Sequence, residues 1–267
     1  MSEEIKNEVP AQEPTATVDS EVKTEATAEV TKPIEESTEE LVNPLTGEVI
    51  SPAKPKEKSS NSPYKQFKPE TTHRVRENIE WTTSYIHNST DNALPRAMCI
   101  GDSICNAYQG RVNNLIHGKY YHGFWASSKC VSDADYMRYL DILMSQNKFD
   151  VITFNNGLHS LLQTSTSTEE YRNSYKLCVQ YLKAKFPEAR IYIVTSTPVR
   201  NEQQNARAVE LNEIVKQIAK EENLPVIDLY ELTNAMDKSN LWSDGVHFQG
   251  HAIDAQAKAI ADAILSK

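Results

Sequence analysis

Short apolar runs alternate with longer amphipathic stretches along the chain from about residue 94 to residue 265. Nearly continuous apolar runs are typical of strands buried on both faces, whereas apolar residues spaced three or four apart are typical of helices. We expect five strands, in RAMCIGDS (ending at Gly101), KYYHGFWAS, FDVITFNN, ARIYIVTST and LPVIDLY, and five helices, at Ile104–His117, Asp133–Asn147, Thr168–Phe186, Glu202–Asn223 and Gly250–Leu265.

The regular alternation of strands and helices indicates βαβ crossovers and a parallel sheet with helices on both faces. Right-handed crossovers and five strands favour a flavodoxin-like, three-layer α/β/α sandwich, which we assign to residues 94–267. Residues 61–93 precede it as a linker. In this linker the segment RENIEWTTSYIHN predicts a short helix that covers an edge of the core.

The first 60 residues differ in composition from the rest of the chain. They carry 14 acidic and 6 basic residues and contain no Trp, Tyr or Phe. Such a segment buries too little apolar surface to offset the entropy of ordering it. We expect a disordered acidic tail, with a docking segment for a partner at Leu41–Pro52 as the alternative.

Composition also narrows the class of protein. The chain has no basic stripe of the kind that binds nucleic acid, and no run of about 18 apolar residues that would span a membrane. The N-terminus lacks the features of a secretory signal, so we expect a cytoplasmic protein with no membrane or nucleic-acid partner. The four cysteines show no metal-ligand spacing and are expected to be free thiols, and no cofactor is implied.

Polar residues follow several of the predicted strands, where ligands bind in sheets of this kind. The loops concerned begin at Asp102, Ser127, Asn155 and Thr195, and a further loop, WSDGVHF, precedes the last helix. We therefore expect hydroxyl, amide and imidazole groups from separate loops to meet at one edge of the sheet.

Ser103, Asp244 and His247 are the residues that could make this edge catalytic. A serine hydroxyl needs a base to remove its proton, and an imidazole acts best as that base when a carboxylate orients it. Asp244 and His247 are three residues apart and can supply both groups. The structural alternative is that Ser103 and Asp244 only cap turns and helices, and that His247 is a surface histidine.

The chain resembles the SGNH, or GDSL-type, hydrolase superfamily over roughly residues 94 to 265. Gly101-Asp102-Ser103-Ile104 matches its first block, and Asp244-Gly245-Val246-His247 matches its last. The resemblance implies that Ser103 is the nucleophile, His247 the general base and Asp244 the acid that orients the base.

The two middle blocks depart from the family pattern. Where the family has an oxyanion-binding glycine, this chain has WASSKCVSD, with Ser127 or Ser128 as the nearest equivalent. Where the family has Gly-X-Asn-Asp, Gly157 matches the glycine and His159 stands at the asparagine's place. We expect the oxyanion donors to be the Ser103 N–H, His159 and one of the amides of Asn155 and Asn156, with Ser127 as a further candidate.

Other residues compete for roles or line the expected site. His159 is a weaker candidate base than His247 because no aspartate accompanies it, and Cys105 is an alternative nucleophile at a helix N-terminus. The expected substrate-binding residues are Asp102, Asn155, Trp242 and Arg200.

The sequence therefore predicts a serine hydrolase that cleaves carboxylic esters. The absence of a long apolar lid segment favours a short acyl group on a small or glycan alcohol, such as an O-acetylated carbohydrate. Two alternatives stay open, namely an acyltransferase that uses the same serine and a non-catalytic binding module that keeps the fold.

Overall fold

The computed structural model of the protein describes residues 41–42, 49–50, 77–161 and 166–266. The chain divides into two units, Met1–Lys65 and Gln66–Lys267. In the first unit, β1 (Leu41–Val42) pairs antiparallel with β2 (Val49–Ile50), inside the expected docking segment. The rest of the expected acidic tail lies outside the described residues.

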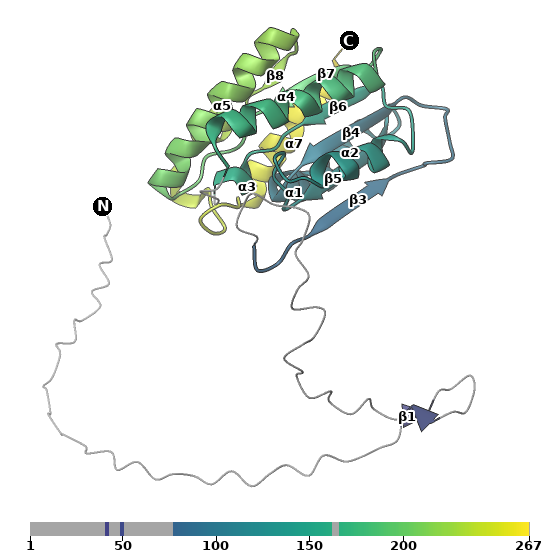
Figure 1. Cartoon of the computed structure of the whole chain (residues 1–267), viewed down its shortest axis with the longest axis horizontal. Helices are drawn as coiled ribbons and strands as arrows, with labels where there is room; N and C mark the ends of the chain where they lie inside the picture. Colours follow the sequence, from purple (N-terminus) through teal and green to yellow (C-terminus); the bar gives the residue numbers. More distant parts are fainter. Residues whose placement is uncertain (1–40, 43–48, 51–76, 162–165, 267) are drawn as a thin grey trace, which may run out of the picture. The chain divides into compact units, whose positions relative to one another are not determined.

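The second unit is built on one six-stranded sheet (Figure 1). Its strand order is β3-β5-β4-β6-β7-β8, and the last five of these strands are parallel, in the order of a flavodoxin-like sheet. The five predicted strands are therefore confirmed. The strands are β3 (Thr82–Ile86), β4 (Arg96–Gly101), β5 (Tyr121–Ser127), β6 (Val151–Phe154), β7 (Arg190–Val194) and β8 (Val226–Ile227).

The sixth strand, β3, corrects the helix predicted in the segment from Arg76 to Asn88. Thr82–Ile86 pairs antiparallel with β5 and covers the outer edge of that strand. Threonine, tyrosine and isoleucine favour extended backbone, and the edge of β5 offers N–H and C=O groups that need partners. Pairing with β5 therefore decides the structure of Thr82–Ile86, although the spacing of the apolar residues predicted a helix.

Helices cover both faces of the sheet and confirm the three-layer sandwich. In Figure 1, α1 and α7 lie on one side of the sheet and α2, α4 and α5 on the other. All five predicted helices are present, and two short helices, α3 and α6, were not expected. The helices are α1 (Ser103–Ile116), α2 (Tyr136–Met144), α3 (Leu158–Leu161), α4 (Thr168–Lys185), α5 (Glu202–Glu222), α6 (Leu229–Asn234) and α7 (Gly250–Leu265).

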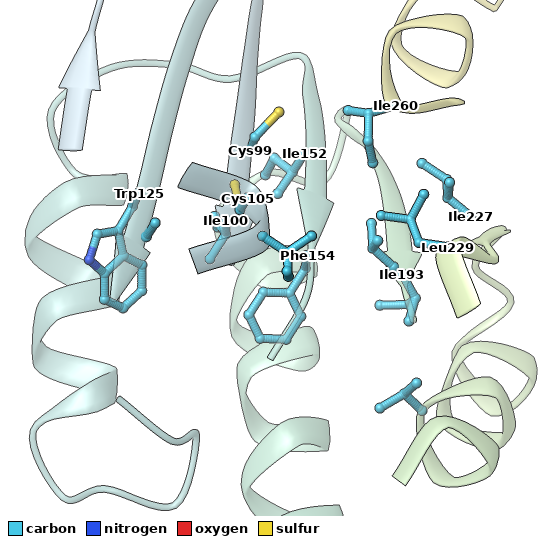
Figure 2. Close-up of a cluster of buried hydrophobic side chains, with 14 of the residues drawn as sticks. Cys99, Ile100, Cys105, Trp125, Ile152, Phe154, Ile193, Ile227, Leu229 and Ile260 are labelled. Atoms are coloured by element: carbon cyan, nitrogen blue, oxygen red, sulfur yellow. The ribbon is translucent and has the colours of Figure 1, made fainter. Parts of the chain in front are cut away.

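A row of large apolar side chains crosses four neighbouring strands (Figure 2). Strand register places Trp125 beside Ile100, Ile100 beside Phe154, and Phe154 beside Ile193. All four are at most 1% exposed, and Phe154 packs its ring 4.8 Å from that of Tyr175 on α4. Each side chain of this kind contributes roughly 1.5–3 kcal/mol on burial, so this row anchors the strands whose ends carry the candidate site.

None of the helices in the part of the chain that the structure describes is both long and apolar enough to cross a membrane.

Two isoleucines test where the stability of the domain resides. Ile152 on β6 is 0% exposed, whereas Ile142 on α2 is 62% exposed. Ile152→Ala leaves a cavity in the core and should lower the free energy of unfolding by about 2–5 kcal/mol. Ile142→Ala should change it by no more than about 0.5 kcal/mol. Urea unfolding measures both, and equal losses in the two variants would contradict the core assignment.

Candidate active site

Ser103 is the first residue of α1, directly after the turn that follows β4. The turn needs glycine at position 101 because a Cβ there would lie 2.6 Å from the Cβ of Cys105. The N-cap of α1 is Asp102, whose Oδ1 accepts a hydrogen bond from the Ile104 N–H at 3.0 Å. Ser103 therefore does not cap the helix, and its hydroxyl is available for another contact.

The N-cap residue Asp102 is also a member of the expected substrate-binding set. The residue is only 2% exposed. Burial raises the pKa of its carboxyl, opposed by the charge on His159 and by N–H bonds from Ile104 and Leu158. The contacts give Asp102 the role of an N-cap, and its assignment to the substrate-binding set stays a prediction.

The loop that carries Asp244 and His247 is held closed by backbone pairing. Trp242 and Phe248 form an antiparallel bridge, and the Ser243 N–H donates to the His247 carbonyl at 2.9 Å. Within the loop, Asp244 Oδ1 accepts the N–H groups of Val246 and His247, both at 2.7 Å. One carboxylate oxygen thus builds the turn, which leaves the other free to contact the His247 ring.

The structure brings Ser103, His247 and Asp244 together in one chain of contacts. Asp244 Oδ2 lies 2.8 Å from His247 Nδ1, and His247 Nε2 lies 2.9 Å from Ser103 Oγ. These are the contacts expected of a base that is oriented by an acid and receives the serine proton. The side chains of His247 and Asp244 are 43% and 56% exposed, so the site opens directly on the surface.

Backbone donors keep Asp244 ionised. The N–H of His247 lowers the pKa of Asp244 to about 2, with the Val246 N–H and the His247 side chain acting in the same direction against burial. The carboxylate therefore stays negative at neutral pH, where it can stabilise a positive charge on the His247 ring.

The side-chain amides of Asn155 and Asn156 hydrogen-bond to neighbouring segments of the chain. Asn156 Oδ1 accepts from the Val131 N–H at 3.1 Å, and its Nδ2 donates to the Lys129 carbonyl at 2.8 Å. Asn155 Nδ2 donates to the Val194 carbonyl at 2.9 Å. Both side chains tie the end of β6 to neighbouring segments, and the expected roles of Asn155 and Asn156 as oxyanion or substrate ligands stay a prediction.

Ser127 and Ser128 are also turned into the protein. Ser127 is 1% exposed, and its hydroxyl accepts a hydrogen bond from the Lys129 N–H at 3.2 Å. Ser128 is 0% exposed, and its N–H donates to the Trp81 carbonyl at 3.0 Å. Because the oxygen accepts this bond, the hydroxyl keeps its own proton, and its role as an oxyanion donor stays a prediction.

His159 lies on α3, in the segment that the sequence placed in a loop. Gly157 precedes it, and a Cβ at this glycine would lie 2.1 Å from Ser196 Oγ, so the β6 and β7 loops approach closely here. His159 is 6% exposed. Its Nε2 is buried and has no hydrogen-bond partner among the described residues.

Glu77 is the residue at this site that sequence reasoning missed. Its Oε1 lies 2.6 Å from His159 Nδ1. The two residues are 82 positions apart, and Glu77 belongs to the segment before β3. No local spacing links them, so no signal in the sequence pointed to the pair.

Cys105 is not a competing nucleophile. It is 1% exposed, and burial raises the pKa of its thiol well above the usual value. The thiol therefore stays protonated and unreactive on the buried face of α1.

Trp242 and Arg200 flank the Asp244–His247 loop. The Trp242 ring stacks on Phe248 with the centroids 4.6 Å apart, and the Arg200 guanidinium lies 6.0 Å from the Trp242 centroid. The Arg200 N–H donates to the Gly245 carbonyl at 2.9 Å, which ties the loop after β7 to the acid–base turn. Both side chains therefore border the site.

Among the described residues, no three His, Cys, Asp or Glu side chains gather in a way that could hold a metal ion.

The model of the GDSL-like lipase/acylhydrolase family matches residues 99–252, which is more than half of the chain. A search of curated proteins gave no match.

Several solved structures share the fold. An acetyl xylan esterase, AlAXEase, has 20% identity and a TM-score of 0.54 over 64% of this chain and 100% of its own. A GDSL-like lipase from Bacteroides thetaiotaomicron has 16% identity and a TM-score of 0.55, over 66% and 93%. Axe2, an acetylxylan esterase from Geobacillus stearothermophilus, has 19% identity and a TM-score of 0.55, over 65% and 95%. At these identities the likeness shows the fold alone.

The origin of the low Asp244 pKa can be tested by titration. The Asp244 carboxyl should titrate at about pH 2, mainly through the backbone N–H of His247. His247→Ala keeps that N–H, so the midpoint should stay well below the ordinary aspartate value. Because the folded pKa is depressed, the stabilisation from this carboxylate is present above the unfolded pKa and is lost as pH falls toward 2. Carboxyl 13C NMR measures the midpoint, and a return to the ordinary value in His247→Ala would contradict this origin.

Proposed function

This chain belongs to the GDSL-like lipase/acylhydrolase family and is an ester hydrolase, and from that premise we propose that it cleaves esters with Ser103, His247 and Asp244 as its triad. The observation that carries the proposal is the unbroken series of contacts from Asp244 Oδ2 through the His247 ring to Ser103 Oγ. A helix cap or a surface histidine would not require that series.

Each member of the triad has a distinct task in the proposed mechanism. Ser103 Oγ attacks the acyl carbonyl while His247 Nε2 takes its proton, and Asp244 stabilises the resulting imidazolium. His247 then returns the proton to the departing alcohol, which leaves an acyl group on Ser103. A water molecule activated by His247 releases the acid and restores the serine.

The oxyanion of the tetrahedral intermediate needs donors at fixed positions. We assign the Ser103 N–H, at the positive end of α1, as one donor and the His159 ring as the other. We choose His159 because it stands at the place of the family's asparagine and its buried Nε2 has no partner among the described residues, whereas Asn155, Asn156 and the Ser127 hydroxyl each make a hydrogen bond within the protein. Loss of one such donor typically costs about 100- to 1000-fold in turnover.

The open position of the site supports a small acyl group on a polar alcohol. His247 and Asp244 are about half exposed, and the sequence holds no long apolar segment that would cover a lipid chain. Two of the structural neighbours are acetylxylan esterases, which supports an O-acetylated carbohydrate as the substrate class. Trp242 and Arg200 would then border the alcohol portion of the ester. We place the catalytic domain at residues 94–267.

Covalent labelling tests the nucleophile. A fluorophosphonate probe should modify the folded protein at Ser103 only, as mass spectrometry of its peptides would show. Ser103→Ala should take no label and should lose about 10⁴-fold or more of its turnover of an acetyl ester. A folded wild-type protein that takes no label would favour the non-catalytic binding module. Labelling combined with acyl transfer to an added alcohol would favour the acyltransferase.

Two substitutions test His159 as an oxyanion donor. His159→Asn keeps a side-chain N–H at this place and should retain turnover within about tenfold of the wild type. His159→Ala removes the donor and should lower kcat by about 100- to 1000-fold with little change in KM. Steady-state kinetics on an acetyl ester measures both. Equal activity in all three proteins would remove His159 from the site.

A further inference from the structure

We propose that Glu77 is a positioning residue that fixes the orientation of the His159 ring through Nδ1, so that Nε2–H faces the substrate oxyanion. This inference rests on the donor role proposed above for His159. Glu77 and His159 form a second histidine–carboxylate pair beside Asp244 and His247. Nε2 of His159 must donate a proton to the oxyanion, whereas Nε2 of His247 must accept one from Ser103.

The contact between the two side chains is short and partly shielded from water. Glu77 Oε1 lies 2.6 Å from His159 Nδ1, and the side chains are 25% and 8% exposed. A charge-assisted hydrogen bond of this length restrains the rotation of the ring. The opposite ring nitrogen, Nε2, is buried without a partner among the described residues. Buried polar atoms seldom lack partners, and a substrate oxygen would supply the missing one.

Counting protons shows what this contact requires of the ring. An ionised carboxylate can only accept, so Nδ1 must carry a proton. A neutral ring would then have a bare Nε2, whose lone pair repels an oxyanion. Only the doubly protonated ring can donate to Glu77 and to substrate together. His247 must instead present a bare Nε2 in order to take the Ser103 proton.

The charged groups around His159 come from two elements. Glu77 contacts the ring directly from the segment before β3. Asp102, on the turn between β4 and α1, is close enough for the charge on His159 to act on its carboxyl. Of these two groups, Glu77 is the one in hydrogen-bond contact with the ring.

A hydrogen-bond network holds Glu77 in place before the sheet begins. The Glu77 N–H donates to Glu80 Oε1 at 3.0 Å, and Glu80 Oε2 accepts from the Ser128 hydroxyl at 2.8 Å. The Trp81 N–H donates to Ser128 Oγ at 2.9 Å, and the Trp81 ring meets His159 edge-on with the centroids 6.1 Å apart. The segment from Glu77 to Trp81 is therefore joined to the loop after β5, beside His159.

Glu77, Glu80 and Trp81 precede residue 99, where the match to the family model begins, whereas Ser128 and His159 lie within the matched range.

Glu77→Gln tests the inference because it keeps the size of the side chain and removes its charge. It should lower kcat by about 10- to 100-fold while KM changes by less than about threefold. In the His159→Asn background the same change should have no further effect, because the two residues act as a unit. Glu213→Gln, an exposed carboxylate on α5, serves as the matched control and should leave activity unchanged. An equal loss from Glu77→Gln in both backgrounds would overturn the inference.

A readout that needs no turnover separates this inference from the proposed function. In 15N NMR spectra recorded at neutral pH, the His159 Nδ1 resonance of the wild type should show the signature of a strong hydrogen bond. Glu77→Gln should weaken that signature. Glu77→Asp, which keeps the charge, should restore part of both the kcat and the ring behaviour. Identical ring spectra in the wild type and Glu77→Gln would overturn the role of Glu77, whereas failure of Ser103 labelling would overturn the hydrolytic mechanism and leave the contact between Glu77 and His159 in place.

Discussion

The parallel pairing of β4 with β5 and β6 determines where every candidate catalytic group can lie. Register brings the carboxyl ends of these strands to one edge of the sheet, so Ser103 emerges beside the loops that follow β5 and β6. The buried row of Trp125, Ile100, Phe154 and Ile193 holds that register. The last loop before α7 then supplies Asp244 and His247 to the same edge, and a 2.9 Å contact closes the site across 144 positions of sequence.

Two histidine–carboxylate pairs meet the two electrostatic demands of ester cleavage in different surroundings. The Asp244–His247 pair is about half exposed, and its carboxylate is kept ionised by backbone N–H groups. The Glu77–His159 pair is largely buried, where fixed charges act more strongly than in water. In our interpretation the first pair takes a proton from the nucleophile and the second retains one for the oxyanion. Residue type alone does not separate these roles, whereas exposure and hydrogen-bond partners do.

Sequence reasoning succeeded where a property is local and failed where it depends on what packs alongside. The strands and helices of the sandwich follow from apolar periodicity, and the contact of Asp244 with His247 follows from their spacing on one turn. A helix was predicted in the segment from Arg76 to Asn88, whereas Thr82–Ile86 is a strand because it pairs with β5. The sequence predicted site roles for Asp102, Asn155, Asn156 and Ser127, but it did not predict that Asp102 caps α1 or that the other three side chains hydrogen-bond to backbone groups.

The sequence by itself determined the order of the elements and the parallel sheet. It also identified Ser103, Asp244 and His247 as the candidate catalytic residues. These properties are encoded in short-range patterns that survive without knowledge of the fold. Tertiary structure alone decided which polar side chains face the site and that Glu77 contacts His159 across 82 positions. The reason is physical: the direction of a side chain in a loop depends on the hydrogen-bond partners that distant segments bring to it, and those partners exist only once the sheet has assembled.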